Sequence, residues 1–393
     1  MKNNILCMIF FIAFTIATLM CECSDVMASN SDESVEIKSK SAVVLEGSTG
    51  VVLYEKEKDE KLNPASITKI MTLLLIYEDL EAGKIKLTDK VRVSEHAASM
   101  GGSQVFLEPE EIQPVETMIK CISIASANDA AVAMAEHLAG SEEAFVARMN
   151  KRAKQLGMNN TSFINCCGLD VEGHYSTAYD VAIMSKQLIC NYPHITKYTT
   201  TWMDSFVHKT RKGEKEFGLT NTNKLVRTYP GITGLKTGST SLAKYCLSAT
   251  AKKKGIDIIS VVMGAPEHKL RYSEAAKLLD YGFSKVNLYE HKIKNKMFGY
   301  VKVKGGNPSS INGYMDGNYK YIKVEGNKSK LSYKVKLKAL TAPVKKDQVI
   351  GKVQYYSNGK LIGSKNVYAK EVSLKVSYID EVYNIIKNIF VLK

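Results

Sequence analysis

Three short strings of residues, which follow one another along the chain, carry the groups needed for acyl transfer. They are Ser66-Ile67-Thr68-Lys69, Ser126-Ala127-Asn128 and Lys236-Thr237-Gly238. A serine hydroxyl becomes a good nucleophile when a neighbouring base takes its proton, and a lysine amine can serve as that base. A second lysine, on a strand, can bind an anion. The set therefore predicts a serine nucleophile that acts on a peptide ending in a carboxylate.

None of the three strings is specific by itself. Ser-x-x-Lys also occurs at residues 241–244 and 357–360, and Ser-x-Asn recurs at residues 310–312 and 364–366. The prediction therefore depends on the order and spacing of the three strings and on the elements that carry them.

The first string lies at the start of a predicted helix. Asn63 is suited to the N-cap and Pro64 to the first helical position, which places Ser66 in the first turn. Lys69 then lies one turn later on the same face. The rest of the helix is apolar nearly all round, so we expect it to be buried and to hold both groups rigidly.

Lys69 must be uncharged to act as a base. A free lysine titrates near ~10.4, so keeping it neutral at pH 7 costs about 4.6 kcal/mol unless its surroundings lower the pKa. Burial and a second cation, for which Lys236 is the candidate, can lower it. Two positive charges ~5 Å apart at an effective dielectric of ~20 repel by roughly 3 kcal/mol, or about two pK units. We therefore predict that Lys69 takes the Ser66 proton.

The second string lies where a long helical pattern is expected to break, within residues 123–129. Side chains at such a break can point out of the packing. Ser126 is predicted to relay a proton to the leaving amine, and Asn128 to hold the substrate backbone. A polar turn without catalytic function is the alternative for this string taken alone.

The third string follows Gly231 and Gly234, where a chain with little side-chain bulk can run as an edge strand open to a peptide. Lys236 and Thr237 are predicted to bind a terminal carboxylate, and Gly238 permits close approach of the backbone. The N–H groups of Ser239 and Ser66 are predicted to form the oxyanion hole. Arg271 is a candidate second positive charge for the carboxylate, and a surface arginine is the alternative.

The elements around these strings indicate an α+β fold, in which helices cover one mainly antiparallel sheet. Apolar runs bounded by turn residues predict strands at each end of this region, with helices between them. The predicted strands are residues 42–45, 50–54, 245–251 and 256–264, and the predicted helices are residues 63–81, 114–139, 141–155, 176–190 and 271–283. We assign residues 41–285 to this catalytic domain.

Beyond about residue 287 the pattern changes to short, Lys-rich, alternating strands such as 333–340 and 349–356, which predict a small all-β domain over residues 286–372. The end of the chain, residues 373–393, is predicted to be an amphipathic helix. It could lie on an anionic membrane surface, or it could pack on its own β-domain.

The start of the chain reads as an export signal. A basic start, an apolar run and small residues ending at Ala28 predict a signal peptide at 1–28, followed by a polar linker at 29–40. A retained membrane anchor is the alternative, and a lipoprotein at Cys21 is less favoured because the preceding residues are not small. Export would leave an odd number of cysteines, which argues against a disulfide framework. They are Cys121, Cys166, Cys167, Cys190 and Cys246.

The net charge of +14 is concentrated at one end, because residues 285–393 hold 22 Lys, no Arg and 7 Asp or Glu. An exported basic module meets anionic lipid and wall polymer, although a merely soluble Lys-rich face is the alternative. The Lys are not interleaved with base-stacking aromatics, so we expect no nucleic-acid partner. His and Cys spacings fit no metal site, so neither a metal nor a cofactor is expected.

On these motifs the chain resembles the D-alanyl-D-alanine carboxypeptidases, the low-molecular-mass penicillin-binding serine peptidases of bacterial cell walls, in their Gram-positive form. Further matching strings are Pro64-Ala65-Ser66, Gly101-Gly102-Ser103, Gly157-Met158 with Asn165 and Gly168-Leu169, and Gly231-Ile232-Thr233-Gly234. Cys166-Cys167 departs from the form often found there, so the resemblance does not predict the structure of this loop.

The resemblance implies a transpeptidase-type fold and an acyl-enzyme on Ser66 with the peptidoglycan pentapeptide. Release of the terminal D-alanine and hydrolysis by water would follow, at the outer face of the membrane or in the wall. It also implies long-lived acylation by β-lactam antibiotics. A class A β-lactamase is the first rival, but its Glu-x-x-Leu-Asn string does not occur here. A non-enzymatic peptidoglycan-binding or β-lactam-sensing module is the second, and it would be expected to have lost a motif residue.

Overall fold

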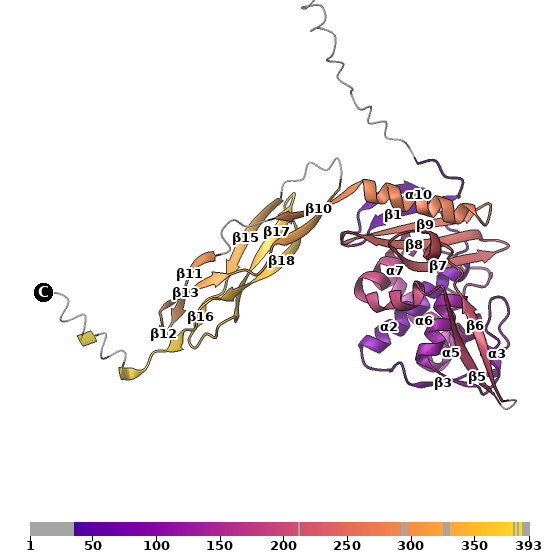
Figure 1. Cartoon of the computed structure of the whole chain (residues 1–393), viewed down its shortest axis with the longest axis horizontal. Coiled ribbons are helices and arrows are strands. Elements are labelled where there is room, and N and C mark those ends of the chain that lie inside the picture. The colour runs from indigo at the N-terminus through magenta and orange to yellow at the C-terminus, as the bar shows by residue number, and fades with distance from the viewer. Residues whose placement is uncertain are drawn as a thin grey trace, which may run out of the picture. The chain divides into compact units, whose positions relative to one another are not determined.

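The computed structural model describes residues 35–210, 213–291, 297–324, 331–379, 382, 385 and 386. The predicted signal peptide (1–28), half of the predicted linker (29–40) and most of the predicted C-terminal helix (373–393) lie outside these residues. The prediction that this helix begins at residue 373 is wrong, because Leu374–Lys375 form a strand that pairs with the β-rich part. Figure 1 shows the arrangement of the elements, and the catalytic part and the β-rich part are described separately.

A five-stranded sheet forms the centre of the catalytic part, in the order β2-β1-β9-β8-β7 (Figure 1). All four neighbouring pairs are antiparallel. The strands that bound the predicted catalytic domain thus pair across the sequence, as expected for an α+β fold. Their bounds are β1 (Ser41–Glu46), β2 (Val52–Lys56), β7 (Ile232–Thr240), β8 (Lys244–Lys253) and β9 (Ile256–Ala265).

Helices cover both faces of this sheet (Figure 1). The helix α10 (Leu270–Ser284) packs on β8 and β9, and α7 (Ala178–Asn191) packs on β1 and β9. Every residue of β1 is buried as a result. A strand covered on both faces must be apolar in sequence rather than alternating, which explains the uninterrupted Ala-Val-Val-Leu run at its centre.

Beneath α7 lies a second helical layer built around α2 (Lys69–Glu81). Ten of its thirteen residues are buried, as the all-round apolar pattern predicts. The other helices of this layer are α4 (Val115–Lys120), α5 (Asn128–Ala139) and α6 (Glu142–Gln155), and short elements join the layers: β3 (Lys90–Arg92), α3 (Glu95–Ala98), β4 (Ile112–Pro114), η3 (Pro193–Ile195), α8 (Thr196–Thr199) and α9 (Leu225–Thr228).

Two helices of the structure differ from their predicted form, at the first and second of the three strings. The helix expected at 63–81 begins as the 3-10 turn η1 (Ala65–Thr68), with Pro64 at the N-cap position, so the predictions of Asn63 as N-cap and of Pro64 as first helical residue are both wrong. The Asn63 amide instead donates to Asp170 Oδ1 at 3.5 Å. The helix expected at 114–139 is interrupted by the π-helical turn η2 (Cys121–Ala125) and by Ser126.

The sequence analysis missed a hairpin, β5 (Met203–Thr210) with β6 (Gly213–Thr220). It is tied to the body of the domain by a buried pair, because His208 Nδ1 lies 3.0 Å from the Glu111 carboxylate. Beyond its end, the Thr222 N–H donates to the Ile124 carbonyl of the π-helical turn at 3.2 Å. The hairpin therefore reaches the break that was expected to carry chemistry.

The β-rich part has a separate apolar cluster, whose buried residues lie within 301–369. Its main sheet has the order β15-β17-β18-β13-β11-β16, and β10 pairs with β14 and β12 with β19. The bounds are β10 (Val286–His291), β11 (Met297–Lys304), β12 (Gly306–Asn307), β13 (Ser310–Tyr314), β14 (Tyr319–Val324), β15 (Leu331–Leu337), β16 (Leu340–Thr341), β17 (Val349–Ser357), β18 (Lys360–Ala369) and β19 (Leu374–Lys375).

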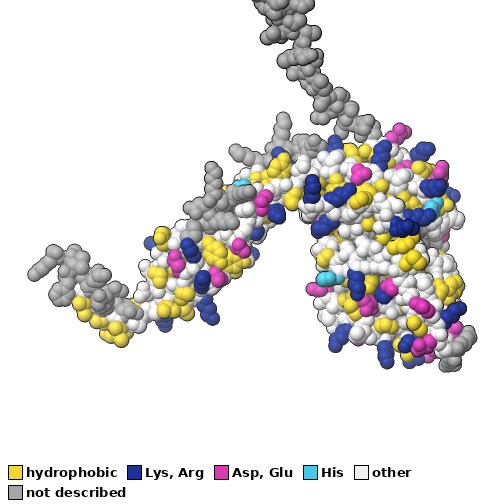
Figure 2. Space-filling view, viewed as in Figure 1, with side chains coloured by type: hydrophobic (Ala, Val, Ile, Leu, Met, Phe, Trp, Pro, Cys, Tyr) yellow, Lys and Arg dark blue, Asp and Glu magenta, His cyan; other side chains and the backbone are white. Residues whose placement is uncertain are grey.

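The surface of the β-rich part combines lysines with exposed apolar side chains, as Figure 2 shows on one face. The most exposed apolar residues follow the last strand: Tyr378 is 82% and Ile379 78% exposed. Over the residues described, no helix has both the length and the apolar character required to span a bilayer.

Candidate active site

Ser66 and Lys69 lie on either side of the junction between η1 and α2. The Lys69 side chain is fully buried, and its Nζ lies 3.1 Å from Ser66 Oγ, while Ser66 remains half-exposed. A spacing of three residues brings the two groups together because 3-10 and α-helical turns both place residues i and i+3 on one face. The candidate nucleophile is thus accessible from solvent, whereas its candidate base is buried.

Lys69 Nζ has two further partners. It donates to Asn128 Oδ1 at 2.5 Å and to the Cys167 carbonyl at 2.8 Å. Both are neutral oxygens, and no acidic side chain forms an ion pair with Lys69 in the described part of the chain. Burial lowers the pKa of Lys69, because desolvation disfavours its ammonium form. The amine therefore has the environment that a general base requires.

The predicted break between two helices is present and carries Ser126 and Asn128. Ser126 ends the π-helical turn in the left-handed conformation, with φ of 65°. Asn128 then starts α5, its N–H donates to Ser103 O at 2.7 Å, and its Nδ2 donates to Gly101 O at 2.6 Å. The Asn128 amide thus holds Lys69 from one side, a role that the sequence analysis did not assign.

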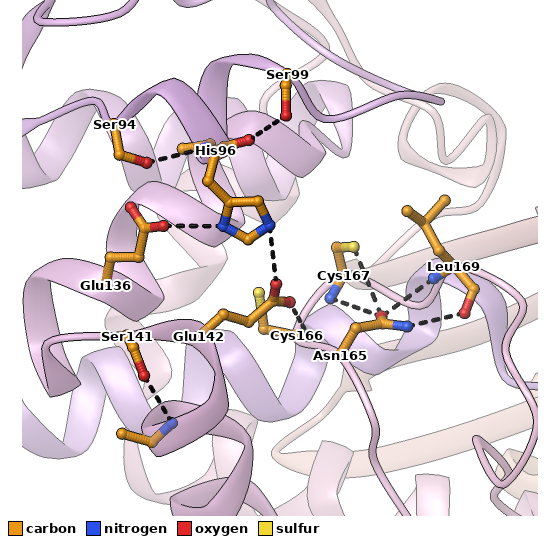
Figure 3. Close-up of polar contacts among 12 residues, drawn as sticks. Ser94, His96, Ser99, Glu136, Ser141, Glu142, Asn165, Cys166, Cys167 and Leu169 are labelled. Carbon is orange, nitrogen blue, oxygen red and sulfur yellow. Dashed lines mark hydrogen bonds and ion pairs between the residues drawn. The ribbon is translucent and has the colours of Figure 1, made fainter.

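The loop that supplies the Cys167 carbonyl is organised by Asn165 (Figure 3). Asn165 Oδ1 accepts from the N–H groups of Gly168 at 2.6 Å and of Leu169 at 3.2 Å, and its Nδ2 donates to Leu169 O at 2.9 Å. Glu142, in the first turn of α6, accepts from the Cys166 N–H at 2.9 Å. Two side chains therefore fix the backbone on either side of Cys167.

This loop packs directly on the turn of the nucleophile. A Cβ added at Gly168, where φ is +91°, would overlap the Ala65 carbonyl. Ala65 has a positive φ of 48°. Any residue with a side chain at position 168 would therefore displace Ala65, the residue that precedes Ser66, and would also disfavour the positive φ found there.

The third string lies on β7, at the edge of the sheet. A Cβ at Gly238 would lie 2.8 Å from Pro64 O and 3.2 Å from Ile67 N, so the absence of a side chain lets β7 lie against η1. Thr237 Oγ1 donates to Thr222 Oγ1 at 2.7 Å, and Lys236 Nζ donates to Thr237 O at 3.2 Å. The strand with the second lysine is thus in contact with the turn that carries the nucleophile.

Arg271 lies at the start of α10, behind β7. Its side chain donates to Gly238 O at 3.1 Å and to Tyr272 Oη at 2.7 Å, and the residue is only 5% exposed. The alternative of a surface arginine is therefore wrong. Within the described residues its buried Nε has no hydrogen-bond partner. Ser239, the next residue of β7 after Gly238, is exposed.

The site holds buried cations without an acidic partner among the residues described. Burial, and then repulsion from Lys69 and Arg271, lowers the pKa of Lys236 well below its usual range. The sequence analysis assigned the lowered pKa of Lys69 to burial and to Lys236. Burial is the cause that lowers the pKa of Lys69, whereas repulsion between the two lysines lowers the pKa of Lys236. Buried positive groups that lack a counter-ion favour an anionic ligand, because such a ligand restores the lost solvation.

Three contributors to this site were missed from the sequence: Thr222, the Cys167 carbonyl, and His174, whose Nε2 lies 2.8 Å from Thr68 Oγ1. Thr222 follows β6, whose alternation over residues 213–220 was a usable strand signal. A backbone carbonyl leaves no signal in residue type, and a single histidine has no spacing to recognise.

Two family models match the chain. A D-alanyl-D-alanine carboxypeptidase model matches residues 26–267, and a model of the C-terminal domain of penicillin-binding protein 5 matches residues 283–373. Together they cover both the catalytic part and the β-rich part.

Curated relatives match over most of their length. The chain is 48% identical to D-alanyl-D-alanine carboxypeptidase DacF of Bacillus subtilis, over 87% of each chain. It is 35% identical to D-alanyl-D-alanine carboxypeptidase DacC of Escherichia coli, over 88% of this chain and 86% of the relative.

Solved structures of penicillin-binding proteins are also similar to this chain over most of its length. Penicillin-binding protein 5 of Haemophilus influenzae is 32% identical with a TM-score of 0.64, covering 86% of this chain and 98% of that one. A peptidoglycan synthesis regulatory factor (PBP3) of Streptococcus pneumoniae is 28% identical with a TM-score of 0.71, covering 86% and 99%.

Proposed function

The chain belongs to the D-alanyl-D-alanine carboxypeptidase family, and from this premise we propose which of its residues perform the reaction and where it works. It is a serine-type D-Ala-D-Ala carboxypeptidase and a penicillin-binding protein, with the transpeptidase fold and C-terminal β-rich domain of this group. The proposal therefore concerns the roles of individual residues, the domain limits and the location of the enzyme.

Ser66 is the nucleophile and Lys69 its base. Neutral Lys69 takes the Ser66 hydroxyl proton while Oγ attacks the carbonyl carbon of the penultimate D-alanine. The peptide C–N bond then breaks, D-alanine leaves with a proton, and the peptide remains as an ester on Ser66. Attack by water on this ester regenerates the serine. The hydrogen bond of 3.1 Å between Nζ and Oγ is the observation that carries this assignment.

Lys236, Thr237 and Arg271 bind the terminal carboxylate of the substrate. The carboxylate would raise the pKa of Lys236, so that the Lys236 ammonium form becomes favoured. Repulsion from that ammonium then keeps Lys69 neutral, and the protonation states of the two lysines are coupled. Substrate binding would thereby place the proton on the lysine that binds and leave the other free to react.

Ser126 passes a proton to the leaving D-alanine, and Asn128 orients both Lys69 and the peptide backbone. The N–H groups of Ser66 and Ser239 donate to the oxyanion. The peptide binds along the edge of β7, and Gly238 lets the η1 turn with Ser66 lie close to that strand. Penicillin would acylate Ser66 by the same route, with opening of its lactam ring.

The experiment is fluorescent-penicillin labelling with peptide mapping, combined with D-alanine release from a diacylated D-Ala-D-Ala peptide. Ser66→Ala should abolish the label and lower release by at least about 10³-fold. Ser241→Ala is the matched control, because it alters a second Ser-x-x-Lys string at residues 241–244 and should leave both activities intact. A label that maps elsewhere, or release that survives Ser66→Ala, would overturn the assignment.

We further propose export through a signal peptide cleaved after Ala28, a catalytic domain at 41–285, a β-domain at 286–372, and membrane association through residues 373–393. The exposed apolar side chains of Tyr378 and Ile379 support the last point. Removal of residues 377–393 should abolish binding to vesicles that contain anionic lipid. If binding is unchanged, another part of the chain must bind the membrane. N-terminal sequencing of the exported protein tests the predicted cleavage after Ala28.

A further inference from the structure

A buried histidine links the turn that carries the nucleophile to the loop that contacts its base. His174 is only 3% exposed. Its Nε2 lies 2.8 Å from Thr68 Oγ1, and its Nδ1 accepts from the Ile164 N–H at 3.1 Å. Thr68 stands between Ser66 and Lys69 in the chain, and Ile164 lies three residues before Cys167.

The Ile164 contact determines the proton position on the ring. A backbone N–H can only donate, so Nδ1 must offer its lone pair. A neutral imidazole then carries its proton on Nε2, which donates to Thr68 Oγ1. Burial lowers the pKa of His174 to about 4, so the neutral ring is the form present at neutral pH.

The backbone around His174 already joins the same two segments. Tyr175 pairs with Ser162 and Ser176 pairs with Leu62 in isolated β-bridges. The imidazole adds a side-chain link between these segments, and its ring lies edge-on to the Phe163 ring, with 5.9 Å between the ring centroids. The segments that contain Thr68 and Ile164 are thus joined both by these backbone bridges and by the hydrogen bonds of the imidazole.

We propose that His174 is a positioning residue for acylation, a role that rests on the function proposed for Ser66 and Lys69. It touches neither of them. By holding Thr68 and Ile164 at once, it fixes the spacing between the η1 turn and the 164–167 loop. That spacing sets the distance from Lys69 Nζ to Cys167 O, which is 2.8 Å, and so helps to aim the amine at Ser66 Oγ, 3.1 Å away on its own turn. A shift of about 1 Å at such a contact can slow a reaction about 100-fold.

Two substitutions at position 174 separate hydrogen bonding from packing. His174→Phe keeps a ring beside Phe163 but leaves the Ile164 N–H and Thr68 Oγ1 without this partner. His174→Gln carries one amide donor and one amide acceptor and can restore both bonds. We expect acylation by penicillin and kcat for D-alanine release to fall about 10- to 100-fold in His174→Phe, with KM little changed, and to recover largely in His174→Gln.

A third variant tests the link from its other side. Thr68→Val keeps the β-branched shape and removes Oγ1, so it should slow acylation as His174→Phe does. The double variant should be no slower than either single one, since both remove the same contact. Thr68→Val with wild-type kinetics, or losses that multiply in the double variant, would contradict the proposal.

The control separates positioning from loss of stability. Ile259→Ala removes buried volume in β9, away from this contact. It should lower the melting temperature yet leave acylation unchanged at a temperature where the protein stays folded. If His174→Phe behaves like Ile259→Ala, or His174→Gln is as slow as His174→Phe, the positioning role is wrong. Loss of all labelling in Ser66→Ala, measured alongside, shows that the proposed nucleophile stands regardless of this outcome.

Discussion

At the scale of single residues, the environment of Lys69 shows how one amine can be kept ready to accept a proton. Its hydrogen bonds go to the neutral oxygens of Asn128 and Cys167, so none of these partners stabilises an ammonium as a carboxylate would. Burial lowers its pKa, and this effect outweighs the opposing effect of the Asp129 carboxylate. Lys236 adds a repulsion that any proton on the pair must overcome.

Lys236→Gln should therefore move the pH profile of penicillin acylation. Without the neighbouring cation, the pKa of Lys69 rises, so more of it is protonated at a given pH. The ascending limb of the profile is expected to shift upwards by about one pH unit or more. Lys236→Arg keeps the positive charge and should keep the limb in place. A limb unmoved by Lys236→Gln would mean that the repulsion does not reach Lys69.

His174 should also make stability depend on pH. Its pKa of about 4 in the folded protein lies below the value of about 6.5 in the unfolded chain. The unfolded state therefore binds more protons between these values, and this contribution is lost as the pH falls from about 6.5 to 4. The loss approaches about 3 kcal/mol. Chemical unfolding can be measured for the wild type and for His174→Gln across this range. The difference between their free energies of unfolding should fall as the pH is lowered, and a difference that stays constant would refute the prediction.

The candidate site residues could be proposed from the sequence because they fall into short strings. The strings containing Ser66, Ser126 and Lys236 carry their chemistry within three or four residues. The contacts of Thr222 and His174 could not be predicted, since each joins segments that lie far apart in the sequence. The role of Asn128 toward Lys69 was missed for the same reason.

At the scale of elements, glycines allow separate segments to approach the nucleophile. Gly168 brings the 165–169 loop onto Ala65, and Gly238 brings β7 onto Pro64. In each case a backbone atom stands where a Cβ would be. Side-chain movement therefore cannot relieve a substitution.

Gly168→Ala should be strongly destabilising and should slow acylation at least about 10-fold. Its cost combines an unfavourable φ with overlap on a backbone carbonyl, together about 3 kcal/mol or more. Gly83→Ala is the matched control, because φ there is +67° but no atom lies within 4 Å of the added Cβ. It should cost only about 1 kcal/mol and leave acylation unchanged. Equal effects of the two variants would show that the close packing on Ala65 is unimportant.

The helix boundaries were predictable where local signals act, and not where tertiary contacts act. Ser141 and Thr177 cap α6 and α7 through their own side chains, and the sequence placed both helices correctly to within a few residues. The break within residues 123–129 was predicted, but the π-helical form of the turn before Ser126 has no such local signal. Its geometry depends on contacts such as that between Thr222 and Ile124.

At the scale of the whole molecule, two apolar clusters share no residue. One contains buried residues within 43–263 and the other within 301–369. The residues proposed for catalysis all come from the first region. A chain ended after Lys285 should therefore still fold, and fluorescent penicillin should label it at a rate within about twofold of the full chain. Loss of labelling in a soluble truncated protein would show that the β-rich part contributes to the site.

The open edge of β7 limits how this enzyme could escape a drug. A ligand that binds there as an additional strand is held by main-chain N–H and C=O groups, and a substitution leaves those groups in place. Since every inhibitor that imitates the peptide would use the same groups, resistance would have to arise from altered shape or charge around the strand. Each such change would also weaken binding of the natural peptide, so lowered affinity for the drug should be accompanied by slower release of D-alanine from the wall peptide.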